Sequence, residues 1–159
     1  MFRTLSLTAA AVLLTTPAFA CDGFEVHDAY ARASTSMSTS GAAFMAMMNT
    51  GDADCHVVGA RSDASQRTEL HTHIQDDNGV MRMVHVEDGF VVPAGGHLML
   101  QRGAEHVMFM GLTAPFEQGN TFNVTLDFED GTEYTFEVPV DLERMPGQME
   151  MPMQGHADH

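Results

Sequence analysis

Three short segments of the sequence place histidine and methionine at every second position. They are His71-Thr72-His73, Met81-Arg82-Met83-Val84-His85 and His106-Val107-Met108-Phe109-Met110. Because successive side chains of a β-strand point to opposite faces, each segment as a strand would present its imidazoles and thioethers on one face. Thioether sulfur is soft and uncharged and suits Cu(I), and neutral imidazole also binds copper. Together the segments predict a soft-metal site.

Core packing is the alternative interpretation of any single pair of methionines, since this flexible side chain fills gaps in hydrophobic cores. We assign Met45, Met47 and Met48 to the core, because GAAFMAMMNT is typical of a buried strand. Met37, in STSMSTS, is either a loop residue or an additional ligand. Three segments with the same spacing are harder to explain by packing alone, which favours the metal site.

The loop over residues 77–79 decides whether two of the segments share a face. A two-residue Asn-Gly turn would turn His71 and His73 away from Met83. A three-residue loop with a glycine bulge would pair His73 with Met83 and His71 with His85. We predict the three-residue loop, or an equivalent bulge, because only that register gathers the ligands on one face.

The elements that must carry these segments are predicted to be short strands. Residues 121–128 and 134–140 alternate polar and apolar side chains, and the Asp-Gly pair between them is typical of a hairpin. No segment after residue 20 keeps a helical periodicity over three turns. We therefore predict an all-β fold, a Greek-key β-sandwich or barrel.

Both ends of the chain differ from this strand-rich region. Residues 1–20 combine an arginine, an apolar run too short to cross a membrane and an Ala-Phe-Ala cleavage site, which predicts a signal peptide. The residues before Cys21 lack the leucine of a bacterial lipoprotein signal, so we do not favour lipidation. Residues 143–159 have no strand pattern and are predicted to form a flexible tail. Residues 21–142 are then the β-domain.

The charge and the cysteines restrict the possible functions. The chain has a formal net charge of −15 and no lysine, which argues against nucleic-acid binding. Cys21 and Cys55 are the only cysteines, and in an oxidising compartment we expect them to form a disulfide. A redox or copper-binding thiol pair is the weaker alternative, because no C-x-x-C motif is present. A blue-copper centre is disfavoured because no cysteine lies near His106, and no nucleophile–base–acid arrangement predicts an enzyme.

The sequence resembles the periplasmic copper chaperone family known as PCuAC, from Ala29 to about Val140. The most similar stretches are Glu69-Leu70-His71, Gly79-Val80-Met81-Arg82-Met83, Val92-Pro93-Ala94-Gly95-Gly96 and His106-Val107-Met108-Phe109-Met110-Gly111-Leu112. Eleven residues separate His71 from Met83, and twenty-two separate Met83 from His106. Both gaps are slightly longer than is usual in the family.

The resemblance implies a cupredoxin-like Greek-key fold and an exposed Cu(I) site. The implied ligands are His71, Met83, His106 and Met108, with His73, Met81 and Met110 as alternates. The implied function is delivery of periplasmic copper toward the CuA centre of cytochrome c oxidase, with oxidase subunit II or Sco-type thiol proteins as partners. Some family members carry similar tails, so a second copper-capture site, with Cu(II) as a candidate ion, is expected at Met149, Met151, Met153, His156 and His159. A copper-sequestering or resistance protein is the alternative function.

Overall fold

The computed structural model describes residues 21–148, which form strands, turns and loops without any helix. The ten strands are β1 (Phe24–Arg32), β2 (Ser40–Asn49), β3 (Cys55–Arg61), β4 (Ser65–Gln75), β5 (Met81–His85), β6 (Phe90–Val92), β7 (His97–Leu100), β8 (His106–Leu112), β9 (Thr121–Phe128) and β10 (Glu133–Pro139). This confirms the predicted all-β class. The structure does not describe residues 1–20 and 149–159, so the predicted signal peptide and the predicted copper ligands of the tail lie outside the described residues.

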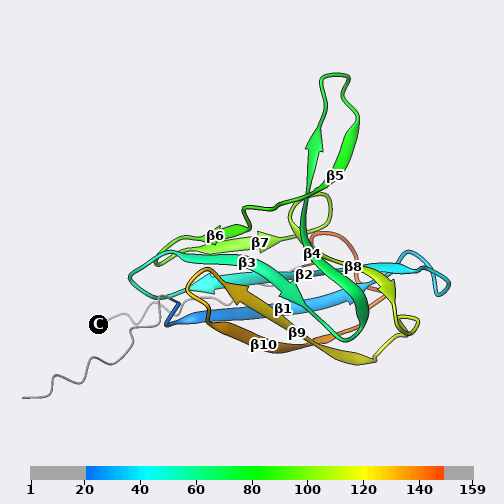
Figure 1. The fold of residues 1–159 in the computed structure, drawn as a ribbon. Helices are drawn as coiled ribbons and strands as arrows, with labels where there is room; N and C mark the ends of the chain where they lie inside the picture. Colours follow the sequence, from blue (N-terminus) through cyan, green and yellow to red (C-terminus); the bar gives the residue numbers. More distant parts are fainter. Residues whose placement is uncertain (1–20, 149–159) are drawn as a thin grey trace, which may run out of the picture.

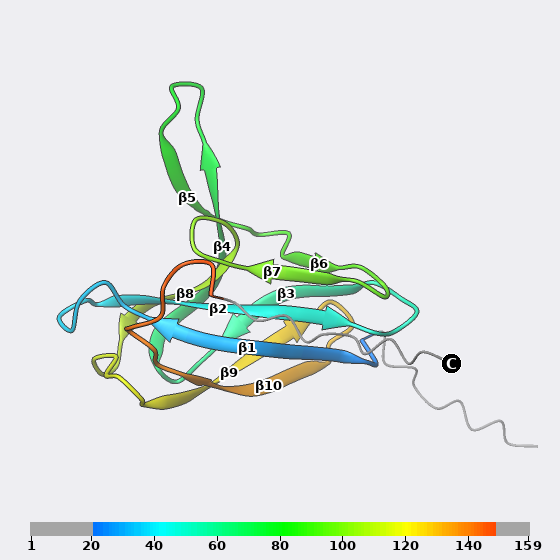
Figure 2. The same ribbon diagram turned by 180° about the vertical axis from the view of Figure 1, so that it is seen from behind.

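The strands form two antiparallel sheets around one hydrophobic core (Figure 1). The larger sheet has the order β1-β2-β8-β4-β5, and β7 pairs with β2 beyond the end of β8. The smaller sheet has the order β10-β9-β3-β6. Seen from behind, β1 of the larger sheet lies beside β10 of the smaller one (Figure 2), and an isolated bridge joins Ala31 to Val140.

Strand β8 has one face in the hydrophobic core and the other face outside it. Val107 and Phe109 have no exposed surface and belong to the core, where the Phe109 ring lies edge-on to Phe116 and Phe122 at centroid distances of 5.9 and 5.3 Å. Met108 lies on the opposite face, since neighbouring residues of a strand alternate. In β2, Met45 and Met47 are also fully buried, which confirms their assignment to the core. Met37 lies in an exposed loop.

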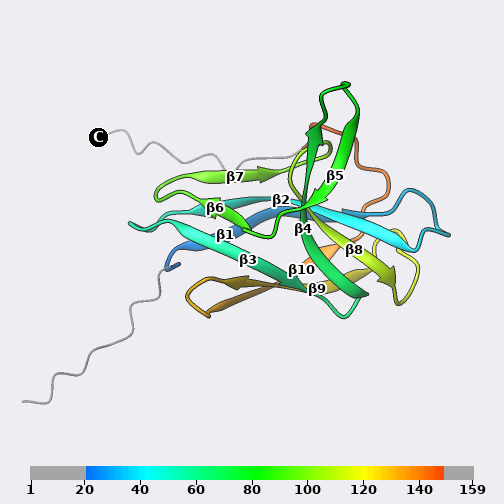
Figure 3. The same ribbon diagram turned by 45° about the horizontal axis from the view of Figure 1, so that its top comes forward.

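The hairpin of β4 and β5 projects from the body of the molecule (Figures 1 and 3). The first part of β4 pairs with β8, whereas residues beyond His71 pair with β5 alone. The connecting loop has three residues, because the Asp76 amide donates a hydrogen bond to the Val80 carbonyl at 2.9 Å and Gly79 has a φ of +81°. A positive φ at this position favours glycine. The predicted three-residue loop is therefore confirmed.

The two cysteines meet where the chain enters β1 and β3. The structure contains Cys21 and Cys55 as thiols that share a side-chain hydrogen bond, and not as the expected disulfide. Burial, together with the neighbouring thiol, raises the pKa of Cys55 to about 12. The two thiol groups are in contact, so oxidation of this pair would form the expected disulfide. The disulfide itself stays a prediction.

Candidate metal site

A row of aromatic rings crosses the larger sheet at the base of the projecting hairpin. The register places His85 of β5, His71 of β4 and His106 of β8 opposite one another. The ring centroids of His71 lie 5.8 Å from His85 and 5.9 Å from His106. The row continues to Phe44 of β2, at 6.2 Å from His106. Because directly opposed residues share a face of a sheet, the fold gathers histidines that are far apart in the sequence.

His106 occupies the centre of this row and is almost completely buried, with 1% of its surface exposed. Its Nδ1 lies 2.9 Å from the Ala104 carbonyl oxygen, which can only accept a hydrogen bond, so Nδ1 carries the proton. The lone pair of the neutral ring is then on Nε2, which is buried and has no hydrogen-bond partner. Burial also lowers the pKa of His106, which favours the neutral form that a metal requires.

His71 has the complementary arrangement. Its Nε2 lies 2.8 Å from an oxygen of Glu69, which leaves the lone pair on a buried Nδ1 without a hydrogen-bond partner. The hydrogen bond from His71 lowers the pKa of Glu69, and Arg67 contacts the same carboxylate at 3.0 Å. A carboxylate that orients an imidazole in this way is a common feature of metal sites.

The spacing of the two rings fits a shared ion. Two imidazoles that each bind one ion through a bond of about 2 Å have ring centroids at most about 6 Å apart. The observed 5.9 Å between His71 and His106 meets this limit. His73 is also close, at 5.2 Å from His106, but its Nδ1 lies 3.3 Å from the Ala104 carbonyl oxygen. Among the described residues, the buried ring nitrogens without a hydrogen-bond partner are those of His71 and His106, which favours His71 over His73 as the second ligand.

The methionines differ in how near they lie to these rings. Met83 and Met108 line one pocket of about 200 Å³ on this face. Met83 is opposite His73, whereas Met81 is opposite Gln75 at the outer end of the hairpin. At a strand rise of about 3.3 Å per residue, Met81 lies about 13 Å along β5 from the row of rings. The register therefore places Met83, and not Met81, near the histidines.

Met110 lies at the other end of β8. It is opposite Arg67, whose Nη2 lies 3.3 Å from the Met110 sulfur. Three residues separate Met110 from His106 along the strand, and Met108, the middle one, lies on the same face as both. The structure thus brings Met108 closer to the imidazoles than Met110.

Two residues near the site were not among the predicted ligands, namely His85 and Glu69. His85 follows Met83 by two positions, just as Met83 follows Met81, and Glu69 precedes His71 by two positions. The same period of two that found the ligands could have indicated both. The predicted three-residue loop already placed His85 opposite His71, and the structure confirms this pairing. What the sequence does not show is that β8 brings His106 to the other side of His71.

The described part of the chain offers few alternative metal sites. Within residues 21–148, no three His, Cys, Asp or Glu side chains are placed to hold one ion. Met83 and Met108 add thioether sulfur as a further type of donor on this face. Over the same residues, no helix is long and apolar enough to cross a membrane.

The chain is similar to several known proteins. A putative lipoprotein of Leifsonia xyli subsp. xyli is 41% identical over 140 residues, which cover 86% of this chain and 82% of the relative. The solution structure of Cu(I)-DR1885 from Deinococcus radiodurans is 32% identical, with a TM-score of 0.56 over 77% of this chain and 82% of that one.

A third comparison supports the fold alone. The copper-bound PCuAC domain from PmoF2 is 18% identical, with a TM-score of 0.61 over 78% of this chain and 97% of that domain. The family model described as putative lipoprotein LpqE-like matches residues 24–140. The chain therefore belongs to the LpqE-like family, which is the family of PCuAC domains.

Proposed function

We propose that the protein is a periplasmic copper chaperone that holds Cu(I) between His71, His106, Met83 and Met108. The observation that carries this proposal is the pair of buried ring nitrogens, His71 Nδ1 and His106 Nε2, that have no hydrogen-bond partner. A buried polar atom without a partner is unfavourable by about 1–3 kcal/mol, and a bound ion would remove that penalty. Two thioethers on the same face make the site selective for a soft ion. Cu(I) is the ion present in the DR1885 relative.

The site is suited to passing copper on. His106 is buried and His71 is half-buried, but Met83 is 46% exposed on the projecting hairpin. An acceptor could therefore approach from the Met83 side and replace this ligand first, while the histidines still hold the ion. We infer that the acceptor is the CuA centre of cytochrome c oxidase subunit II, or a Sco-type protein that supplies it. The protein then acts as a carrier and not as an enzyme.

The tail is proposed to add a second copper site. Its ligands are Met149, Met151, Met153, His156 and His159. Two histidines among them make Cu(II) a suitable ion there. The tail would collect copper and pass it to the site at His106.

Titration of the mature protein with Cu(I), in competition with a chromophoric Cu(I) chelator, tests the core site. We expect His106→Ala to lower the affinity of one equivalent by at least tenfold, and removal of residues 149–159 to remove further copper without changing that equivalent. His97→Ala is the matched control, because His97 is an exposed histidine of β7, outside the row of rings. Unchanged binding in His106→Ala would reject the core site.

A second experiment separates delivery from sequestration. Deletion of the gene should reduce cytochrome c oxidase activity when copper is scarce, and added copper should restore that activity. If deletion caused only sensitivity to excess copper, the protein would be a sequestering or resistance protein that uses the same site.

A further inference from the structure

The pocket beside the two thioethers has an unusual charge for this protein. Apart from Met83 and Met108, its lining residues include Arg32, Arg102, Ser34 and Ser40. No aspartate or glutamate lines it. The whole chain has 22 acidic residues against seven arginines. A pocket lined by positive charge alone is therefore not explained by overall composition.

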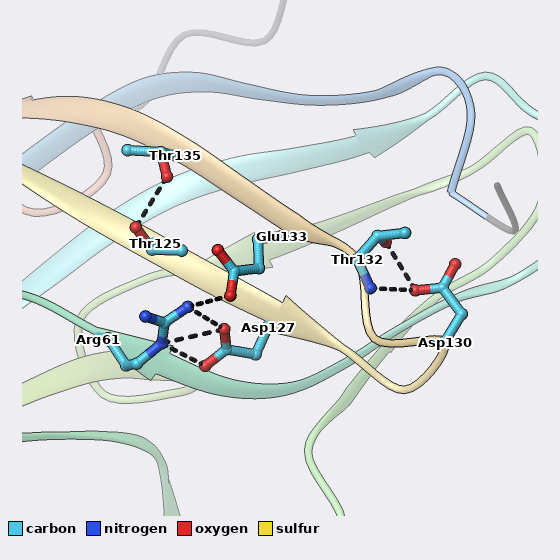
Figure 4. A network of polar contacts seen from close by, with 7 residues as sticks. All are labelled: Arg61, Thr125, Asp127, Asp130, Thr132, Glu133 and Thr135. Carbon is cyan, nitrogen blue, oxygen red and sulfur yellow. Dashed lines mark hydrogen bonds and ion pairs between the residues drawn. The ribbon is translucent and has the colours of Figure 1, made fainter.

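The pairing of the arginines points to the same pocket. Residues 21–148 contain six arginines, and four of them bind carboxylates: Arg61 with Asp127 and Glu133, Arg67 with Glu69, Arg82 with Asp76, and Arg144 with Asp28. Figure 4 shows the fully paired example, Arg61, on the smaller sheet. Among the six described arginines, Arg32 and Arg102 are the two that form no ion pair with a carboxylate.

Arg32 and Arg102 line the same pocket and both act on Tyr30. Arg32 donates one hydrogen bond, from Nη1 to the Arg144 carbonyl oxygen at 3.1 Å. An arginine has five N–H donors, so others of its N–H groups could bind a ligand. Arg102 is exposed in the loop between β7 and β8. Burial raises the pKa of Tyr30, and the charges of Arg144, Arg102 and Arg32 all act in the opposite direction. Arg32 and Arg102 therefore lie within electrostatic reach of one phenol group.

We propose that this pocket is an anion-binding subsite that takes a carboxylate between Arg32 and Arg102, beside Met83 and Met108. The planar donor groups of arginine match the two oxygens of a carboxylate, and serine hydroxyls can donate further hydrogen bonds. A volume of about 200 Å³ admits a small dicarboxylate or the end of an acidic side chain. The anion would lie next to two proposed copper ligands. The molecule that carries this carboxylate would therefore be one that delivers copper to the protein or takes copper from it.

Binding of the carboxylate requires no copper, so it can be measured on the apo protein. The mature chain would be titrated with succinate at constant ionic strength, and amide signals of Ser34, Gly41 and Arg102 followed by NMR. We expect saturable shifts of these signals, and at least a tenfold weaker dissociation constant in Arg102→Gln. Arg61→Gln is the matched control and should bind succinate as the wild type does.

Two outcomes would overturn the proposal. One is the absence of saturation, with shifts that sodium chloride reproduces at the same ionic strength. The other is equal affinity in the wild type and Arg102→Gln. Retained succinate binding in His106→Ala, a variant that lacks a proposed copper ligand, would separate this subsite from the copper site.

A second titration of the same protein tests whether the carboxylate belongs to a small molecule or to a protein segment. A short peptide rich in aspartate and glutamate replaces succinate. Binding at least tenfold tighter than succinate would identify an acidic segment of a copper-exchanging protein as the source. Comparable binding would identify a free small carboxylate, and in either case loss of binding in Arg102→Gln supports the subsite.

Discussion

At the scale of single residues, two hydrogen bonds decide the chemistry of the row of rings. The Ala104 carbonyl fixes the proton of His106 on Nδ1, and the Glu69 carboxylate does the same for Nε2 of His71. Each ring is thereby left with its lone pair on a buried nitrogen. The residue types alone do not determine this, because either nitrogen of a neutral imidazole can carry the proton.

The two neighbouring methionines of β5 provide a direct test of this arrangement. Met83→Leu should lower the affinity for Cu(I) by about tenfold or more, because a thioether that binds the ion contributes more than about 1.4 kcal/mol. Met81→Leu should change the affinity less than twofold, although Met81 is similarly exposed, at 54% against 46%. Competition with a chromophoric Cu(I) chelator measures both. A larger effect at Met81 would mean that the hairpin bends inward to place Met81 at the ion.

The burial of His106 predicts a pH dependence of stability in the apo protein. Its pKa is lowered in the fold, so the unfolded chain binds the proton more readily. The contribution of the neutral ring is therefore complete above the unfolded pKa of about 6.5. It decreases as the pH falls through that value toward the lower folded pKa.

Urea unfolding of the apo protein at pH 7, 6 and 5 measures this contribution. His106→Gln should lose less unfolding free energy between pH 7 and pH 5 than the wild type does. His97→Gln, at an exposed histidine, should follow the wild type. Parallel curves for the wild type and His106→Gln would show that His106 does not control the acid response.

At the scale of elements, the three-residue loop holds the site together. The loop places His73 opposite Met83 and His71 opposite His85, so that both strands of the hairpin contribute to one face. A shift of one residue would turn the Met83 side chain to the other face. The hairpin carries little of the core, since Met81, Met83 and His85 are all exposed. Its register can therefore be changed with little effect on the rest of the fold.

Deletion of Asn78 tests the importance of the loop, since it leaves a two-residue connection. We expect the Cu(I) affinity to fall about as far as in Met83→Leu, while the thermal unfolding midpoint changes by only a few degrees. Gly79→Ala is the control, because it strains the positive φ by about 1 kcal/mol but keeps the loop length. Unchanged copper binding after the deletion would show that Met83 is not a ligand.

At the scale of the whole molecule, the cysteine contact connects the start of β1 to the start of β3, one strand in each sheet. If the predicted disulfide forms, it closes the loop between residues 21 and 55 and restricts the unfolded chain. In the chain-entropy model such a loop contributes about 3 to 4 kcal/mol.

Urea unfolding with and without dithiothreitol should show a difference of this size for the mature protein. Cys21→Ser should show no difference between the two conditions. Mass spectrometry under non-reducing conditions gives the second measurement, since the disulfide lowers the mass by two hydrogens. An unchanged mass would mean that the pair remains as thiols, as in the structure.

The sequence by itself determined the fold class and the types of side chain available as candidate ligands. Alternation in residues 121–128 predicted a strand that the structure reproduces, and the period of two in β8 separated Phe109 in the core from Met108 on the other face. These properties are local, because each follows from which side of a strand a side chain faces. The preference for a soft ion is also local, since it follows from the residue types.

Only the tertiary structure decided which candidates meet. His71 and His106 are 35 positions apart in the chain, and they become neighbours because β8 pairs with β4. The pairing of β4 with β5 places His85 opposite His71 and leaves Met81 away from the rings. The pairing of β4 with β8 places Met110 opposite Arg67 and Glu69 opposite Met108. Arg32 and Arg102 likewise share a pocket only because the loop before β8 lies against β1 and β2. Such contacts depend on strand order, which no short stretch of sequence specifies.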